Sequence, residues 1–191
     1  QNSNYLILRN YDNHESMNSS GLDIDFLTSD RNFHYHINGI KKHQNKNRAA
    51  YRVKIGNKEY DTDIRTVYDG YYDSKWSLDM LKNKILYNDN FFIPNSLNEF
   101  YSLLYHVLIH KNQLNNKYDD RLIKLSNDID LNFNSSVWDD RNKISDILSH
   151  FLDKNQYKIT NPNDFSVQYN QDNKGFKRII WEMIGKIKKK L

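Results

Sequence analysis

The stretch Gly21-Leu22-Asp23-Ile24-Asp25-Phe26-Leu27 places two carboxylates two residues apart in an otherwise apolar segment. Side chains at positions i and i+2 of a β-strand point to the same face of the sheet. If this segment is a strand, Asp23 and Asp25 leave it together. A second segment, Tyr60-Asp61-Thr62-Asp63-Ile64-Arg65, repeats the spacing. A carboxylate from a neighbouring strand is therefore expected to join the first pair.

Three carboxylates that converge on a sheet form a strong site for a hard divalent cation, because Mg²⁺ prefers oxygen ligands and keeps substrate phosphates among them. The pattern favours an enzyme that acts on phosphate esters, with Asp23, Asp25 and Asp63 as catalytic residues and as ligands of Mg²⁺ or Mn²⁺. Asp61 shares the face of Asp63, so either can be the third acid. The competing interpretation is a solvated acidic face on an antiparallel sheet. The apolar residues that flank the first pair argue against it.

The length and composition of the chain exclude several other classes of protein. The 191 residues fit one domain or two small ones. A hydrophobic fraction of 38%, with 9 Phe and 14 Tyr, is too apolar and aromatic for a disordered chain. The formal net charge of +4 gathers largely near the C-terminus, so no nucleic-acid partner is inferred from it. No stretch approaches the roughly 18 apolar residues of a membrane helix.

The chain contains no cysteine, which excludes disulfides and thiolate metal sites and suits a reducing compartment. There is no signal-peptide pattern, and a cytoplasmic location is expected. The chain opens at Gln1 without Met, which indicates an excised or trimmed piece.

Local patterns predict the order strand, strand, helix, strand, strand in the first half of the chain. The expected strands cover 5–10, 22–27, 51–55 and 59–67, and the expected helix covers about 30–39. The predicted fold class is α/β (α+β), a mixed sheet with a helical cover over residues 1–92.

From Ser74 the pattern changes to helix, and residues 93–191 are expected to form a helical subdomain. A helix begins at Ser74, and Phe91-Phe92-Ile93-Pro94 is a short extended link. Ser96-Leu97-Asn98-Glu99 matches a capping box and predicts a helix to about residue 111. Further helices are expected at about 117–130 and 138–154, and 157–169 looks irregular or extended. Residues 175–191 predict a basic amphipathic helix, which can pack on its own domain or make peripheral contact with an anionic membrane.

The acid pair in Gly21-Leu22-Asp23-Ile24-Asp25 and the later acid in Asp63-Ile64-Arg65 resemble the nucleotidyltransferase superfamily of the polymerase-β type. The resemblance covers roughly residues 5–67. It implies two Mg²⁺ ions held by Asp23, Asp25 and Asp63, with the third acid also able to act as a base. The chain also resembles uncharacterised nucleotidyltransferase-like proteins of glycan-synthesis gene sets. That resemblance implies a nucleoside triphosphate or nucleotide-sugar donor and a small-molecule or glycan acceptor.

One departure from the superfamily pattern concerns the Gly-Ser or Gly-Gly turn that cradles the triphosphate before the acid pair. Here Leu8-Arg9-Asn10-Tyr11 occupies that region, and Ser20 and Gly21 lie directly against the acid pair. Three alternatives stay open: a domain that keeps the fold and binds without catalysis, an antibiotic-modifying or toxin-type nucleotidyltransferase, and, on weaker grounds, RNA binding. Polymerisation is less expected, because no duplex-binding domain is evident.

Further candidates for substrate binding surround the acids. Arg9 suits a bidentate contact with phosphate, or an ion pair within the sheet, and Arg65 follows the third acid. Tyr71 lies in the turn after the third-acid strand, either as an aromatic rim that stacks on a base or sugar or as part of a packed turn. His106 and His110 share a helix face and suit a phosphate contact, a zinc pair or a structural role.

Overall fold

The computed structural model describes residues 4–9, 11, 23–43, 48–111, 118–133, 137, 140–164 and 166–167. The chain forms two compact units. The first unit comprises Gln1–Asn95 and Thr160–Ser166, and the second comprises Ser96–Ile159 and Val167–Leu191. None of the described helices is long and apolar enough to cross a membrane.

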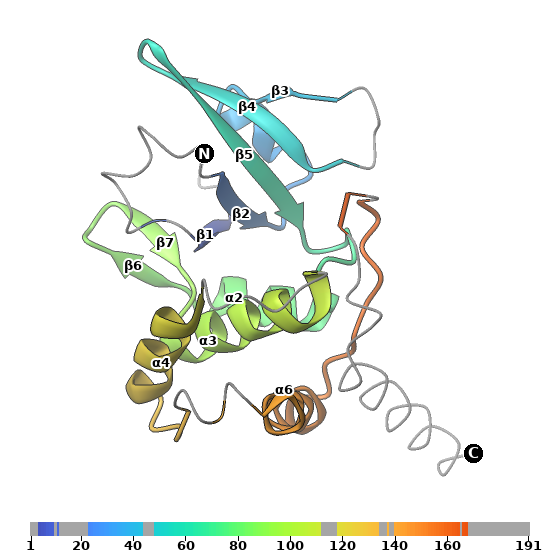
Figure 1. Ribbon diagram of the computed structural model, residues 1–191. Coiled ribbons are helices and arrows are strands. Elements are labelled where there is room, and N and C mark those ends of the chain that lie inside the picture. The colour runs from blue at the N-terminus through green and yellow to red at the C-terminus, as the bar shows by residue number, and fades with distance from the viewer. Residues whose placement is uncertain are drawn as a thin grey trace. The chain divides into compact units, whose positions relative to one another are not determined.

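A five-stranded mixed sheet, in the order β1-β2-β5-β4-β3, forms the centre of the first unit (Figure 1). Strand β1 (Tyr5–Arg9) runs antiparallel to β2 (Ile24–Thr28), which runs parallel to β5 (Lys58–Thr66). Strand β4 (Ala50–Ile55) is antiparallel to β5 and to the short β3 (Ile40–Lys41). The α/β class with a mixed sheet, expected from the sequence, is confirmed.

Side chains along β5 alternate between the two faces of the sheet, as the period of two requires. Asp63 and Arg65 point to one face, and Ile64 and Thr66 point to the other. The parallel register places Asp25 of β2 directly opposite Asp63 of β5. The predicted convergence of acidic residues from two strands is therefore built into the pairing of β2 with β5.

The first helix, α1 (Phe33–His36), is much shorter than the predicted helix over 30–39. Phe33 is its one buried residue and packs on Phe26 and Tyr5. The backbone of Asn38 turns left-handed, with φ of 52°, which ends the helical path. One apolar anchor is not enough to hold a longer amphipathic helix against the sheet.

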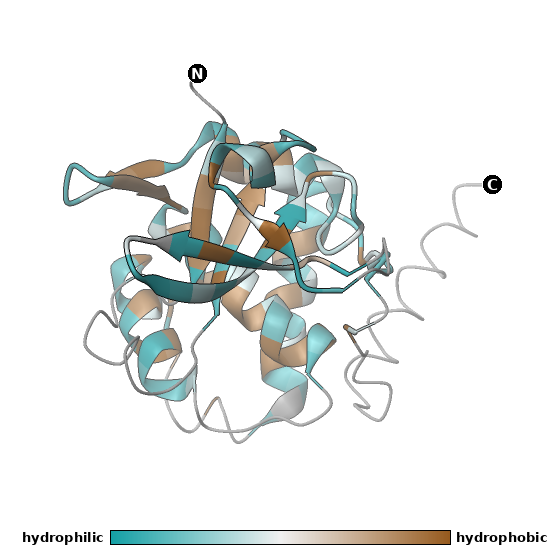
Figure 2. Ribbon diagram, turned by 90° about the horizontal axis from the view of Figure 1, so that it is seen from above, coloured by the Kyte–Doolittle hydropathy of each residue, from teal (hydrophilic) through white to brown (hydrophobic). Residues whose placement is uncertain are grey.

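A second helix and a hairpin follow the sheet. Helix α2 (Ser74–Lys82) begins after Asp73, whose side chain accepts hydrogen bonds from two backbone amides of the first turn. Strands β6 (Ile85–Tyr87) and β7 (Phe91–Ile93) then pair antiparallel. Figure 2 shows this hairpin with hydrophobic strands and a hydrophilic tip. The sequence predicted only the extended link at 91–94 and missed β6, which is a single short strand with an exposed face.

The second unit is helical. Helix α3 (Ser96–Tyr105) continues into the π-helix η2 (His106–His110), and together they cover the helix predicted over 96–111. Helices α4 (Asp119–Asp128) and α6 (Arg141–Asn155) confirm the other two predictions in this part of the chain. Helix α3 packs on both of them. The aromatic rings of Tyr101 in α3 and Phe151 in α6 stack 3.7 Å apart.

Residues 160–166 belong to the first unit, although the sequence predicted them to be part of the helical second half of the chain. The Thr160 hydroxyl donates to the Gly70 carbonyl at 2.8 Å, and the Asn163 amide donates to the Asp69 carbonyl at 2.7 Å. Gly70 permits this approach, because a Cβ atom there would lie 2.4 Å from the Asn161 carbonyl oxygen. The predicted helix over 175–191 lies outside the described residues.

Candidate functional site

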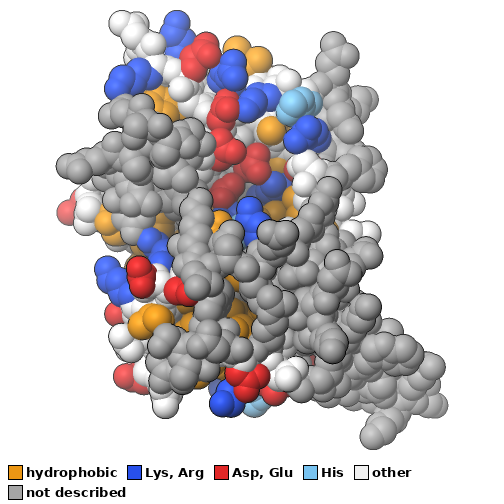
Figure 3. All heavy atoms as spheres, in the orientation of Figure 1, with side chains coloured by type: hydrophobic (Ala, Val, Ile, Leu, Met, Phe, Trp, Pro, Cys, Tyr) orange, Lys and Arg blue, Asp and Glu red, His pale blue; other side chains and the backbone are white. Residues whose placement is uncertain are grey.

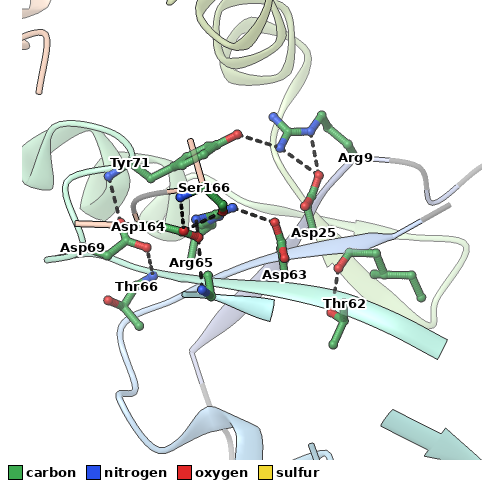
Figure 4. A network of polar contacts seen from close by, with 12 residues as sticks. Arg9, Asp25, Thr62, Asp63, Arg65, Thr66, Asp69, Tyr71, Asp164 and Ser166 are labelled. Carbon is green, nitrogen blue, oxygen red and sulfur yellow. Dashed lines mark hydrogen bonds and ion pairs between the residues drawn. The ribbon is translucent and has the colours of Figure 1, made fainter. Parts of the chain in front are cut away.

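Asp25 and Asp63 lie side by side at the centre of the candidate site, each with its own arginine (Figure 4). Arg9 donates from Nε to Asp25 Oδ2 at 2.8 Å, and its Nη2 is also 2.8 Å from the same oxygen. The register of β1 shifts between Ile7 and Arg9, and this irregularity sets Arg9 opposite Asp25. Arg9 is buried. Of its two predicted roles, the structure shows the ion pair within the sheet.

Arg65 joins two carboxylates that are far apart in the sequence. Its Nη2 donates to Asp63 Oδ2 at 2.6 Å, and its Nη1 donates to Asp164 Oδ2 at 2.8 Å. Burial opposes ionisation of Asp164, but hydrogen bonds from Ser166 and Ala49 and the charge of Arg65 outweigh it and lower the pKa of Asp164 to about 2. Asp164 is thus a permanent anion that neutralises Arg65 at neutral pH.

The sequence does not single out Asp164 as a functional residue. It lies 99 positions from Arg65, in a segment without hydrophobic periodicity. No local pattern marks a residue whose partner is so distant, because the ion pair forms only when residues 160–166 dock against the end of β5.

Tyr71 and Tyr72 close the network on the side of Arg9, which donates to the Tyr71 hydroxyl at 3.1 Å and to the Tyr72 hydroxyl at 3.3 Å. The guanidinium of Arg65 lies 4.3 Å from the centroid of the Tyr71 ring, within the range of a cation–π contact. Burial raises the pKa of both tyrosines, so their hydroxyls stay protonated. Tyr71 is 3% exposed, which agrees with the packed turn and leaves no open ring face for a substrate in this conformation.

Asp23 and Asp61 lie on the same face as Asp25 and Asp63 but are more exposed. Partial burial, and then the charges of Asp63, Asp61 and Asp25, raise the pKa of Asp23. Hydrogen bonds from Lys42 and Arg52 lower the pKa of Asp61, with Lys42 Nζ 2.5 Å and Arg52 Nε 3.3 Å from its carboxylate oxygens. The pKa values of these two outer acids are therefore shifted in opposite directions, upward for Asp23 and downward for Asp61.

Figure 3 shows a group of Asp and Glu side chains in the upper half of the view, with Lys and Arg side chains beside them. Arg9 and Arg65 both bind the Oδ2 atoms of their partners. Among the described residues, Oδ1 of Asp25 and Oδ1 of Asp63 have no hydrogen-bond partner. One oxygen of each carboxylate therefore stays available to a cation.

The chemistry of these donors suits Mg²⁺ or Mn²⁺, which take hard oxygen ligands. Within the described part of the chain, however, no three His, Asp or Glu side chains stand close enough together to hold a metal ion as they are. The acids share one face of the sheet, but their present conformation is that of an arginine-paired network. A bound cation would require side-chain movement.

The remaining predicted residues lie elsewhere. His106 and His110 belong to η2 in the second unit, both are buried, and their ring centroids are 5.9 Å apart. Ser20 and Gly21 lie outside the described residues, so the turn before the acid pair stays a prediction. The described site consists of Arg9 and the acids of β2 and β5, with Arg65, Tyr71 and Asp164.

Comparisons with models of known protein families, with curated proteins and with solved structures found no match.

Proposed function

We propose that the first unit is a Mg²⁺- or Mn²⁺-dependent nucleotidyltransferase, or a related phospho-sugar transferase, with Asp23, Asp25 and Asp63 as the cation ligands. The observation that carries the proposal is the parallel register of Asp25 with Asp63. It sets two carboxylates next to each other on one face of the sheet, and Asp23 precedes Asp25 by two residues on the same face. Burial is the first cause of the raised pKa of Asp23, and the charges of Asp63, Asp61 and Asp25 are the next, a contribution that a divalent cation would relieve.

Arg9 and Arg65 have a positioning role in this proposal. Each holds one carboxylate in a fixed orientation through Oδ2, and the Oδ1 atoms of Asp25 and Asp63 serve the cation. Asp61 is the weaker candidate for the third ligand, because Lys42 and Arg52 already bind both of its oxygens. Asp23, which is exposed, is the residue that moves to complete the site.

The bound cation supplies charge neutralisation of the phosphates and lowers the pKa of an acceptor hydroxyl. The carboxylates of the chain hold the cation in position. The donor is a nucleoside triphosphate or a nucleotide sugar, and the acceptor is a small molecule or a glycan precursor. The sequence resemblance, not the geometry, suggests these substrates.

A second candidate is a domain that binds a nucleotide or protein partner without catalysis. The ion pairs of Arg9 and Arg65 favour it, because they already give Asp25 and Asp63 a counter-charge. In that case the acidic network is a structural element, and a divalent cation has no specific site on it.

Calorimetric titration with Mn²⁺ separates the two candidates. The wild-type protein is expected to bind Mn²⁺, and Asp23→Asn is expected to weaken binding by about tenfold or more, since it removes one charged ligand. Asp89→Asn is the matched control, because Asp89 lies at the exposed tip of the β6–β7 hairpin, away from the sheet face. Repeating the titration with each nucleoside triphosphate, and measuring pyrophosphate release, identifies the donor.

A folded wild-type protein that binds no Mn²⁺, with or without nucleotide, contradicts the transferase proposal and supports the binding domain. Equal weakening in Asp23→Asn and Asp89→Asn also contradicts it, because the effect would then reflect only lost surface charge.

A further inference from the structure

A separate pocket of about 260 Å³ lies at the end of β5, on the opposite face of the sheet from the acids. Its lining includes Ile64 and Thr66, which alternate with Asp63 and Arg65 along the strand. Two tyrosines and two arginines contribute further side chains, namely Tyr51, Tyr68, Arg31 and Arg48. The volume suits a small polar molecule rather than a macromolecule.

The two arginines of this pocket lack the partners that arginines have elsewhere in the sheet. Among the described residues, neither Arg31 nor Arg48 forms an ion pair or a hydrogen bond. The Nε atom of Arg48 is buried without a partner in that part of the chain. Arg31 makes one contact, with its guanidinium 5.6 Å from the centroid of the Tyr68 ring. A buried cationic nitrogen without a partner is costly, and an anion in the pocket would remove that cost.

The two carboxylates that line the pocket, Asp69 and Asp164, form no hydrogen bond or ion pair with these arginines and accept from other donors. Asp69 accepts from the backbone amides of Thr66 and Tyr71, one through each oxygen. Asp164 accepts from Ala49 and Arg65 through Oδ2, and from Ser166 through Oδ1. All four oxygens are engaged with donors other than the two pocket arginines.

Hydroxyl donors complete the lining. The hydroxyls of Thr66, Tyr51 and Tyr68 have no hydrogen-bond partner within the described residues. Burial, with a smaller effect of Tyr35, raises the pKa of Tyr51, so this hydroxyl remains a donor at neutral pH. Two guanidinium groups and three hydroxyls give the pocket a surplus of donors, which suits an oxyanion with several acceptor oxygens.

We propose that this pocket binds a small phosphomonoester, with Arg31 and Arg48 on the phosphate and the two tyrosines beside the group that carries it. A phosphate offers acceptor oxygens to both guanidinium groups, which are the lining's only cationic side chains beside the carboxylates of Asp69 and Asp164. The ring faces of the tyrosines suit a sugar or another compact ring. None of the proposed donors belongs to the face that carries Asp63, although Asp164 both lines the pocket and pairs with Arg65 of the acidic site.

Isothermal titration of the full chain with ribose 5-phosphate, without divalent cation, tests the proposal. Ribose and gluconate serve as probes that lack the phosphate, and inorganic phosphate lacks the sugar. We expect ribose 5-phosphate to bind more tightly than all three. Arg48→Met is expected to weaken its binding by about tenfold or more, the size of one lost charge-assisted contact, and Arg48→Lys by less.

Two further variants keep the test decisive. Lys54→Met removes one positive charge from an exposed position of β4 outside the pocket, and it should leave binding unchanged. Arg31→Met should weaken binding in a background where Arg48 is intact. The proposal is overturned if the folded protein binds no phosphate probe, if gluconate binds as well as ribose 5-phosphate, or if Lys54→Met weakens binding as much as Arg48→Met.

Discussion

The two faces of the sheet at the end of β5 differ in whether their arginines are paired with carboxylates. On the acidic face, Arg9 and Arg65 are buried and each contacts a carboxylate within 2.8 Å. On the other face, Arg31 and Arg48 line a pocket and contact no carboxylate in the described part of the chain. A paired buried arginine stabilises a fold only as part of its pair, whereas an unpaired one is free to recognise a ligand.

The aspartates of this region also differ in what surrounds them. Asp164 and Asp69 are held by several donors from the chain itself, and they organise the junction between β5 and residues 160–166. At Asp23, burial and then the charges of Asp63, Asp61 and Asp25 raise the pKa. We therefore look for structural effects at Asp164 and for ligand effects at Asp23.

The largest expected loss of stability comes from removing an arginine that is paired with carboxylates on the acidic face. Arg65→Met leaves Asp63 and Asp164 without their shared counter-charge, so we expect a loss of about 3–5 kcal/mol in the free energy of unfolding. Arg48→Met breaks no ion pair and should change stability by no more than about 0.5 kcal/mol. Urea denaturation at pH 7 measures both. Equal losses in the two variants would show that the two faces do not differ in this way.

A smaller loss of stability is expected from a change at Gly70, in the turn against which residues 160–166 pack. Gly70 has a φ of 74°, and a Cβ atom there meets the Asn161 carbonyl oxygen at 2.4 Å. Gly70→Ala should cost about 3 kcal/mol, because backbone strain adds to displacement of residues 160–166. Gly56 has a similar φ of 61° with nothing within 4 Å, so Gly56→Ala isolates the strain at about 1 kcal/mol. Equal melting temperatures for the two variants would exclude a tight docking of residues 160–166.

Asp164 gives a pH-dependent prediction. Its pKa of about 2 lies below the roughly 3.9 of an unfolded aspartate. Ionised Asp164 therefore stabilises the folded state above about pH 4, and this contribution is lost as the pH falls from about 4 to 2. We expect Asp164→Asn to be about 2 kcal/mol less stable than wild type at pH 7. The difference should narrow over that acid window in urea titrations, and a difference independent of pH would contradict the assignment.

The smallest effect is expected at the exposed rim of the acidic face. Asp61 is paired with Lys42 and Arg52, but its side chain is 36% exposed. Asp61→Asn should cost no more than about 1 kcal/mol at low salt, and less in 1 M NaCl because the pairs are screened. Thermal denaturation at the two salt concentrations measures this. A salt-independent loss above about 2 kcal/mol would place Asp61 with the buried acids.

Much of the first unit was predictable from local pattern. The strands β1, β2, β4 and β5 follow hydrophobic alternation, and the shared face of Asp25 and Asp63 follows from the period of two. The helices of the second unit follow from their apolar stripes. The errors are the short elements α1, β3 and β6, which depend on a few tertiary contacts such as that of Phe33 with Phe26. Local propensity does not encode such contacts.

The sequence by itself determined that acidic side chains from two strands share one face, because alternation in a strand is a local property. Tertiary structure alone decided their partners. Arg9 reaches Asp25 through an irregularity in β1, and Asp164 reaches Arg65 across 99 positions. The unpaired state of Arg48 likewise depends on where distant carboxylates find their donors. The strength of an ion pair depends on the distance between the two charged groups and on the local dielectric constant. The number of residues between the two groups in the sequence does not determine that distance.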